Sequence, residues 1–151
     1  MYHKILIGYD GSDGSKAALD RAVVLAQTLG ARLVALWAQS SLPHYPETVA
    51  EVQEESESGR TYFRRICKHA TAVASEKGVH LFFEHIEGHP AQALVKYARD
   101  EKCDLIVLGH SGHSGLWGHL LGHTANRVSE NASCSVLIVR TQPKATRKKA
   151  K

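Results

Sequence analysis

The sequence predicts an α/β fold in which a five-stranded parallel sheet carries helices on both faces. Three observations support this prediction. Short apolar segments typical of buried strands alternate along the chain with amphipathic segments of helical length. Glycine or proline stands at most boundaries between them. Such an alternation implies right-handed crossovers, and these crossovers produce parallel sheets that lie between two layers of helices.

The composition is typical of a globular protein with one domain. The chain has 151 residues, of which 43% are hydrophobic and 23% charged, so it is long enough to bury a core. It contains no apolar run near the roughly 20 residues that span a bilayer and no secretory signal pattern at its start. The three cysteines, Cys67, Cys103 and Cys134, are odd in number and far apart, which argues against a disulfide framework. We therefore expect a cytoplasmic protein with no membrane contact and with buried or half-buried thiols.

The net charge of +4 belongs to the end of the chain. Five of the last eight residues are basic, and without them 14 basic residues stand against 15 acidic ones. We expect one domain over residues 1–141 and a basic, disordered tail over residues 142–151. Weak contact of this tail with nucleic acid or an anionic membrane is the alternative, and nucleic acid is not the expected partner of the domain.

The first part of the chain predicts two strands that flank a helix. The apolar runs His3–Tyr9 and Arg32–Gln39 predict the strands. Between them, apolar residues recur at helical spacing over Ser15–Leu29, after a polar turn that offers an N-cap. Gly30 is placed to end this helix as a C-cap.

The middle of the chain predicts a loop, a long helix and a third strand. Ser40–Thr48 contains two prolines and is expected to be a loop. Glu47–Lys77 predicts a helix whose acidic start suits the positive end of the helix dipole, with Tyr62, Ile66, His69 or Ala70, and Val73 on its apolar face. Val79–Ile86 predicts a strand.

The last part predicts two helices and two further strands. Pro90 stands near the first turn of a helix whose expected buried stripe is Ala93, Leu94, Tyr97 and Ala98. Asp104–Leu108 predicts a fully buried strand, a short helix is expected from Asn126, and Ser135–Arg140 predicts the fifth strand.

A glycine-spaced segment between Leu108 and Asn126 is the strongest functional signal. Gly109, Gly112 and Gly122 allow backbone conformations and close approaches that a Cβ atom would prevent. Free backbone N–H groups in such a loop, next to a helix N-terminus, favour a phosphate. Glycines that only permit a tight turn are the alternative interpretation.

The position of Asp10 supports the phosphate pocket. Asp10 follows the first strand, and Gly109 follows the fourth. Ligands of open parallel sheets bind beyond the carboxyl ends of strands, where the strand order reverses. If the two strands are neighbours at that reversal, both residues face one crevice.

Four segments together resemble the universal stress proteins of the UspA family, over the chain up to about Arg140. They are Lys4–Ser12, Asp104–Gly112, the glycine spacing that ends at Gly122, and Ser133–Val139. The resemblance implies the strand order 3-2-1-4-5 and the Rossmann-like fold of the adenine nucleotide alpha-hydrolases. It also implies a homodimer through the last strand, at Val136, Leu137, Ile138 and Val139.

The glycine spacing resembles that of the family's ATP-binding class. This resemblance implies that Asp10 lies by the adenosine, that the backbone of Trp37 and Ala38 faces the adenine, and that Gly109 is near the ribose. Gly112 and the residues around Gly122 would hold the phosphates. The residues implied as nucleotide-binding are Gly8, Asp10, Ala38, Gly109, His110, Gly112, His113, Ser114, Gly122, His123 and Thr124.

One residue departs from the pattern of that class. The third glycine is usually followed by Ser or Thr, whereas this chain has His123 and then Thr124. Three arrangements remain open: main-chain N–H groups hold the phosphate alone, Thr124 supplies a hydroxyl, or His123 donates from its ring.

The sequence predicts binding and no catalytic constellation. It contains no Walker lysine motif and no Gly-x-Gly-x-x-Gly after the first strand, so any hydrolysis is expected to be slow and incidental. The expected ligand is ATP, ADP or AMP, with Mg²⁺ carried by the phosphates rather than by a protein metal site. The resulting expectation is a nucleotide-dependent dimer in the stress response. The alternative is a member that does not bind nucleotide and acts through its dimer and protein partners.

Overall fold

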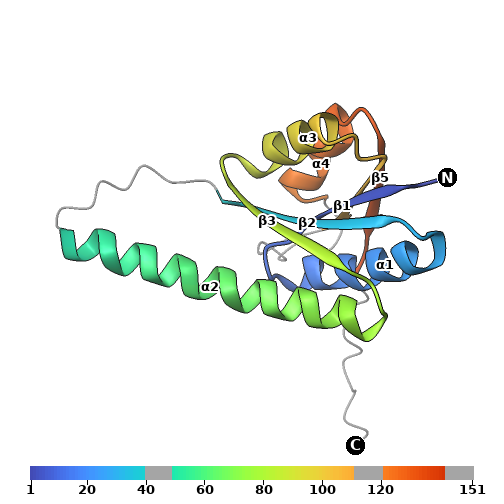
Figure 1. Ribbon diagram of the computed structural model, residues 1–151. Coiled ribbons are helices and arrows are strands. Elements are labelled where there is room, and N and C mark those ends of the chain that lie inside the picture. Colours follow the sequence, from blue (N-terminus) through green and yellow to red (C-terminus); the bar gives the residue numbers. More distant parts are fainter. Residues whose placement is uncertain (40–48, 111–120, 142–151) are drawn as a thin grey trace, which may run out of the picture.

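The computed structural model describes residues 1–39, 49–110 and 121–141, with the side chains of all of these except 49–57. The predicted loop Ser40–Thr48 and the basic tail therefore lie outside the described residues. Strands and helices alternate as the sequence predicts (Figure 1). In chain order they are β1 (Lys4–Gly8), α1 (Asp13–Leu29), β2 (Arg32–Gln39), α2 (Val49–Glu76), β3 (Leu81–Glu87), α3 (Pro90–Asp100), β4 (Leu105–Gly109), α4 (His123–Asn131) and β5 (Ser135–Val139).

The five strands form one parallel sheet in the order β3-β2-β1-β4-β5, which confirms the predicted fold. β1 occupies the centre, and its Leu6 is in register with Val34 of β2 and Ile106 of β4. The chain therefore runs outward from β1 to one edge of the sheet, returns, and continues to the other edge. The order reverses between β1 and β4, which is where open parallel sheets place their ligands.

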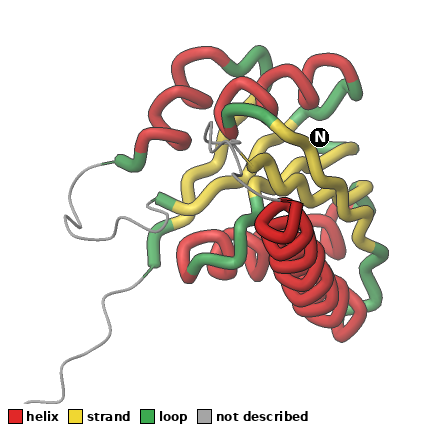
Figure 2. The backbone as a smooth tube through the Cα atoms, turned by 90° about the vertical axis from the view of Figure 1, so that its left-hand side faces the viewer, coloured by secondary structure: helices red, strands yellow, loops and turns green. Residues whose placement is uncertain are grey.

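Two hydrophobic cores lie on the two faces of the sheet. Alternate residues of β1 point to opposite faces, so Ile5 and Ile7 pack with α1 and α2 while Leu6 packs with α3 and α4. All three side chains are fully buried. Figures 1 and 2 show the sheet between these two helical layers, as a central parallel sheet requires.

The caps of α1 agree with the signals in the sequence. Ser12 accepts a hydrogen bond from the backbone N–H of Ser15 and caps the helix, which begins at Asp13, two residues before the predicted start. Gly30 ends the helix with φ 65°, a left-handed conformation that glycine adopts without strain.

The predicted start of α4 is wrong by three residues. The helix begins at His123 rather than Asn126, and the first helical bond runs from the N–H of Asn126 to the carbonyl of Gly122. Gly122 is the N-cap in an extended conformation, without a side chain to mark the helix start. This difference matters because it brings the N-terminus of α4 next to the carboxyl end of β4.

α2 is much longer than the strands that it covers. Its 28 residues span about 42 Å, and Figure 1 shows its first turns extending past the edge of the sheet. Ile66, Ala70 and Ala74 are buried at four-residue intervals, whereas His69 is exposed. In α3 the fully buried residues are Ala91, Leu94 and Ala98, so Ala91 takes the place predicted for Ala93.

The three cysteines have the expected environments, with Cys103 buried and Cys67 and Cys134 half-buried. Burial raises the pKa of the Cys103 thiol to about 11, so this thiol stays protonated at neutral pH. Among the helices of the described residues, none has the length and apolarity needed to cross a membrane.

Replacing Tyr9 with phenylalanine tests the packing of the core. The Tyr9 side chain is 1% exposed, and its hydroxyl has no hydrogen-bond partner among the described residues. Because a buried hydroxyl without a partner is unfavourable, we expect Tyr9→Phe to raise the free energy of unfolding by about 1 kcal/mol. Urea denaturation measures this change, and a comparable loss of stability would show that the hydroxyl makes a favourable bond.

Tyr9 also gives a pH readout. Burial, followed by the nearby Tyr62 and Asp10, raises the pKa of Tyr9 to about 12. The unfolded chain therefore loses this proton near pH 10 while the folded chain keeps it, and stability falls as the pH rises from 10 toward 12. Tyr9→Phe should reduce this fall.

Candidate functional site

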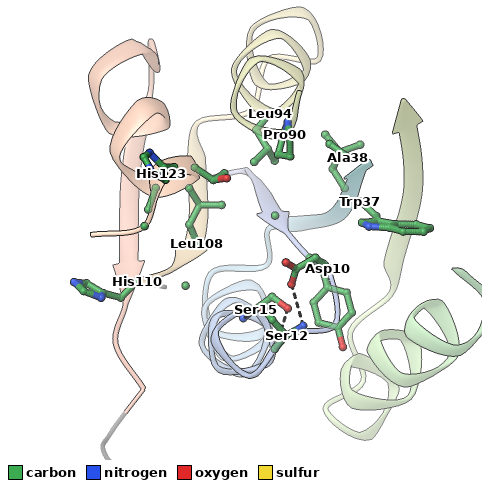
Figure 3. Close-up of a pocket in the computed structure, with 17 residues that line it drawn as sticks. Asp10, Ser12, Ser15, Trp37, Ala38, Pro90, Leu94, Leu108, His110 and His123 are labelled. Atoms are coloured by element: carbon green, nitrogen blue, oxygen red, sulfur yellow. Dashed lines mark hydrogen bonds between the residues drawn. The ribbon is translucent and has the colours of Figure 1, made fainter. Parts of the chain in front are cut away.

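A cavity of about 330 Å³ lies at the carboxyl edge of the sheet, where the strand order reverses (Figure 3). Strands β1, β2 and β4 contribute their last residues, and α1, α3 and α4 contribute their first turns. The volume lies within the range of small-molecule sites. The lining residues are Gly8, Tyr9, Asp10, Ser12, Ser15, Leu36, Trp37, Ala38, Pro90, Leu94, Leu108, Gly109, His110, Gly122, His123, Thr124 and Ala125.

The structure brings together all of the predicted nucleotide-binding residues that it describes. They come from four separate segments of the chain and line this one cavity: Gly8, Asp10, Ala38, Gly109, His110, Gly122, His123 and Thr124. The predicted residues Gly112, His113 and Ser114 lie outside the described residues.

Sequence reasoning missed most of the apolar wall. Three leucines belong both to the cavity wall and to the hydrophobic core between the sheet and α3: Leu36, Leu94 and Leu108. Pro90 stands at the start of α3 and lines the cavity too. Pro90 could have been predicted as part of the site. It follows the turn from β3 to α3, and in a parallel sheet every turn from a strand to a helix lies at the same edge.

Trp37 forms part of both the cavity wall and an aromatic cluster. The side chain is 6% exposed, and its ring stacks on His85 at a centroid distance of 4.5 Å and on Phe63 at 6.0 Å. It also contacts the ring of Tyr62 at 5.2 Å. The indole is therefore held between β3 and α2 on the β2 side of the cavity.

Asp10 is held in place by bonds to both its side chain and its backbone. Its carboxylate Oδ1 accepts a hydrogen bond of 2.9 Å from the N–H of Ser12, and its carbonyl accepts one from the Tyr62 hydroxyl. Figure 3 shows the carboxylate beside Ser12 and Ser15. Among the described residues that line the cavity, Asp10 supplies the one carboxylate.

The hydroxyl groups of Ser12 and Ser15 stabilise the start of α1. Ser12 Oγ accepts from the N–H of Ser15 at 3.3 Å, and Ser15 Oγ donates to the carbonyl of Ser12 at 2.9 Å. Both serines are buried. Their polar atoms thus already have partners in the helix cap, which is the ordinary structural role of serine at this position.

The N-terminus of α4 differs from that of α1, because no described side chain caps it. The N–H of Gly122 donates to the carbonyl of His110 at 2.8 Å. The N–H of His110 in turn donates to the carbonyl of Val139 at 2.8 Å. These bonds fix the start of α4 against β4 and β5. His123, Thr124 and Ala125 form the first turn, line the cavity, and belong to the positive end of the helix dipole, which favours an anion.

Gly109 is required by packing within the protein, and Gly8 lies in close contact with a leucine side chain. A Cβ atom on Gly109 would lie 2.6 Å from the carbonyl carbon and oxygen of Gly14, in the first turn of α1. A Cβ on Gly8 would lie 2.6 Å from Cδ2 of Leu108. The glycine spacing of the sequence suggests that Gly109 allows a ligand to approach, whereas the structure gives Gly109 an internal reason: α1 and β4 touch through their backbones.

The fold and the cavity define a class of protein: an α/β protein with a cavity at the carboxyl edge of a parallel sheet, where a helix N-terminus meets an apolar wall. The sequence places the chain within that class. Residues 1–140 match the model of the universal stress protein family, and the chain belongs to this family.

Individual relatives agree with the family assignment. A universal stress protein of Methanocaldococcus jannaschii is 35% identical, over 95% of this chain and 85% of its own. The structure of the universal stress protein UspA of Lactobacillus plantarum is 30% identical, with a TM-score of 0.81 over 92% of this chain and 98% of its own. A universal stress protein solved in complex with cAMP is also 30% identical, with a TM-score of 0.73 over 93% and 99% of the two chains.

The contact between Gly109 and Gly14 predicts that Gly109→Ala is strongly destabilising. The new methyl group meets backbone rather than a movable side chain, so we expect a loss of at least about 2 kcal/mol in urea denaturation. Gly59→Ala is the matched control, because a Cβ there meets nothing within 4 Å. In the interior of α2 this change should be neutral or stabilise by up to about 1 kcal/mol. Equal effects at the two sites would contradict the packing role of Gly109.

Proposed function

We propose that this universal stress protein binds an adenine nucleotide in the cavity and acts in the stress response as a nucleotide-dependent dimer. The observation that carries the proposal is the opening of the N-terminus of α4, which no described side chain caps, onto a cavity with an apolar wall. A nucleotide combines the two matching chemistries, because its base is flat and apolar and its phosphate is an anion.

The geometry suggests how the nucleotide lies. The base fits between the apolar residues and the end of β2, where Trp37 and Ala38 line the cavity. The phosphates fit at the first turn of α4, on the opposite side. Asp10, two residues after the end of β1 and between these two ends, is placed to accept hydrogen bonds from ribose hydroxyl groups, because an ionised carboxylate is an acceptor.

The relative solved with cAMP supports an adenine nucleotide as the ligand class. It shares 30% identity with this chain and nearly the full length of both proteins. Within that class we propose ATP, with ADP and AMP as the related ligands to compare. Mg²⁺ would enter with the phosphates, and among the described lining residues the carboxylate of Asp10 would supply the anionic oxygen to hold it.

A binding role fits the cavity better than a catalytic one. The two serines use their hydroxyl groups in the cap of α1, and the described lining presents no nucleophile paired with an oriented base. We therefore propose that any hydrolysis is slow and incidental, and that occupancy of the cavity is the signal.

The alternative function is a dimer that acts through protein partners without nucleotide. One observation favours the dimer in either case. β5 is an edge strand in which Leu137 is 37% exposed and Val136 and Ile138 are half-buried. An apolar edge strand is a template for pairing with a second chain, so we propose that Val136, Leu137, Ile138 and Val139 form the dimer interface.

Calorimetric titration of Asp10→Asn tests the nucleotide site. The amide keeps an oxygen that can accept from the N–H of Ser12, so the turn should persist while the charged acceptor is lost. We expect affinity for ATP to fall about tenfold, which is typical of a lost hydrogen bond to a charged group. Asp13→Asn is the matched control, since Asp13 is exposed and does not line the cavity.

Two results would contradict this proposal in different ways. If the unaltered protein binds none of ATP, ADP, AMP and cAMP, the cavity is not a nucleotide site and the partner-binding dimer becomes the better account. If Asp10→Asn and Asp13→Asn bind ATP equally well, nucleotide binds without the help of Asp10.

A further inference from the structure

The phosphate end of the cavity has an unusual charge composition. The ionisable residues among those described as lining the cavity are Tyr9, Asp10, His110 and His123, with no lysine or arginine. The sequence from 109 to 126 contains four histidines and no Lys, Arg, Asp or Glu. Among the described lining residues, a positive side-chain charge for a phosphate must therefore come from an imidazole, a group that changes its charge in the physiological range.

His123 stands where an anion would meet α4. It is the first residue of the helix, is exposed, and lines the cavity. His110 is only 8% exposed and is joined to the same helix start through the bond from the N–H of Gly122. Figure 3 shows both histidines on the side of the cavity opposite Trp37 and Ala38.

We propose that His123 is a phosphate ligand whose protonation sets the affinity of the cavity, so that nucleotide binds more tightly as the pH falls. This inference rests on the proposed nucleotide function and adds a regulation to it. The exposed imidazole can turn onto an anion bound at the first turn of α4. In its protonated form the ring adds a full positive charge and a charged N–H donor to the partial charge of the helix end.

The sign of the effect follows from linkage. A bound phosphate favours the protonated imidazole, so binding takes up a proton. The affinity gained in this way is present while the imidazole is protonated and is lost as the pH rises and the imidazole becomes neutral. An imidazole changes its charge in the physiological range, so the change is expected between about pH 5.5 and 8.5.

The other ionisable groups of the described lining are Tyr9, Asp10 and His110, and His110 carries an imidazole as His123 does, so the variants below assign the dependence to one histidine. Tyr9 stays neutral, because burial raises its pKa to about 12. Arg127, four residues further along α4, and Arg140, directly after β5, are exposed and are not among the residues that line the cavity. Asp10 lines the same cavity, and the Asp10→Asn variant tests its part directly. α3 contributes only Pro90 and Leu94, and β2 only Leu36, Trp37 and Ala38.

The experiment is a calorimetric titration of the full chain with cAMP at several pH values from 5.5 to 8.5. A cyclic phosphodiester keeps one negative charge throughout this range, whereas a phosphate monoester loses its second proton near pH 6 and would confuse the result. We expect the Kd for cAMP to rise about tenfold from the lowest to the highest pH, which corresponds to a shift of one pH unit in the titration of one histidine. Adenosine, which has no phosphate, should show little change.

Three variants assign the effect to a residue. His123→Asn should reduce the pH dependence to less than about twofold, and His123→Lys should keep tight binding at all pH values because lysine stays charged. His80→Asn is the matched control and should leave the dependence unchanged. His80 is exposed and directly precedes β3, at the edge of the sheet opposite the cavity. Both positions are exposed, and thermal unfolding verifies that the variants fold.

The outcomes separate this inference from the proposed function. If cAMP binds with the same affinity at every pH, or if His123→Asn keeps the full dependence, the role of His123 is wrong while the nucleotide site stands. If adenosine shows the same dependence as cAMP, the titrating group does not act on the phosphate, and the inference is likewise wrong. If neither cAMP nor ATP binds at any pH, the proposed function itself fails.

Discussion

The cavity depends on a backbone contact between two elements far apart in the sequence. Gly109, at the end of β4, lies so close to Gly14 in the first turn of α1 that a Cβ atom would be 2.6 Å from the carbonyl of Gly14. This approach sets β4 against the start of α1. The chain after β4 returns to begin α4, whose Gly122 bonds to the carbonyl of His110. One glycine contact thus positions the segments that form the polar end of the site.

The opposite end of the cavity is built from different interactions. There Trp37 is held by aromatic contacts with His85, Phe63 and Tyr62, and Tyr62 in turn donates to the carbonyl of Asp10. The long helix α2 therefore supports both the aromatic wall and the backbone of Asp10. The site joins an apolar wall to the positive end of a helix, and each part exists for a structural reason before any ligand is considered.

Local patterns were sufficient to predict most of the fold. Alternating apolar and amphipathic segments predicted every strand and helix of the described chain, and Gly30 marked the end of α1 because only a left-handed residue completes that cap. The strand order, by contrast, came from the family resemblance, because sequence periodicity does not say which strands pair. The start of α4 was misplaced because Gly122, as an N-cap without a side chain, carries no recognisable signal.

The residues of the candidate site could be predicted only in part, because local sequence patterns do not record contacts between distant segments. Asp10 and Gly109 stand directly after buried strands, so topology alone places them at one edge. Leu94 and Leu108 were not predicted as part of the site, since an apolar residue that packs in the core and also lines a cavity looks the same in sequence as any core residue. The packing role of Gly109 depends on a distant segment, Gly14, and no local pattern records it.

The central claim is that this universal stress protein carries an adenine nucleotide in the cavity. The most direct test is mass spectrometry of the small molecules that the purified protein releases on denaturation. We expect an adenine nucleotide at close to one molecule per chain. A protein that releases none, and that also fails to bind added ATP or cAMP, would contradict the account and leave the dimer as its functional surface.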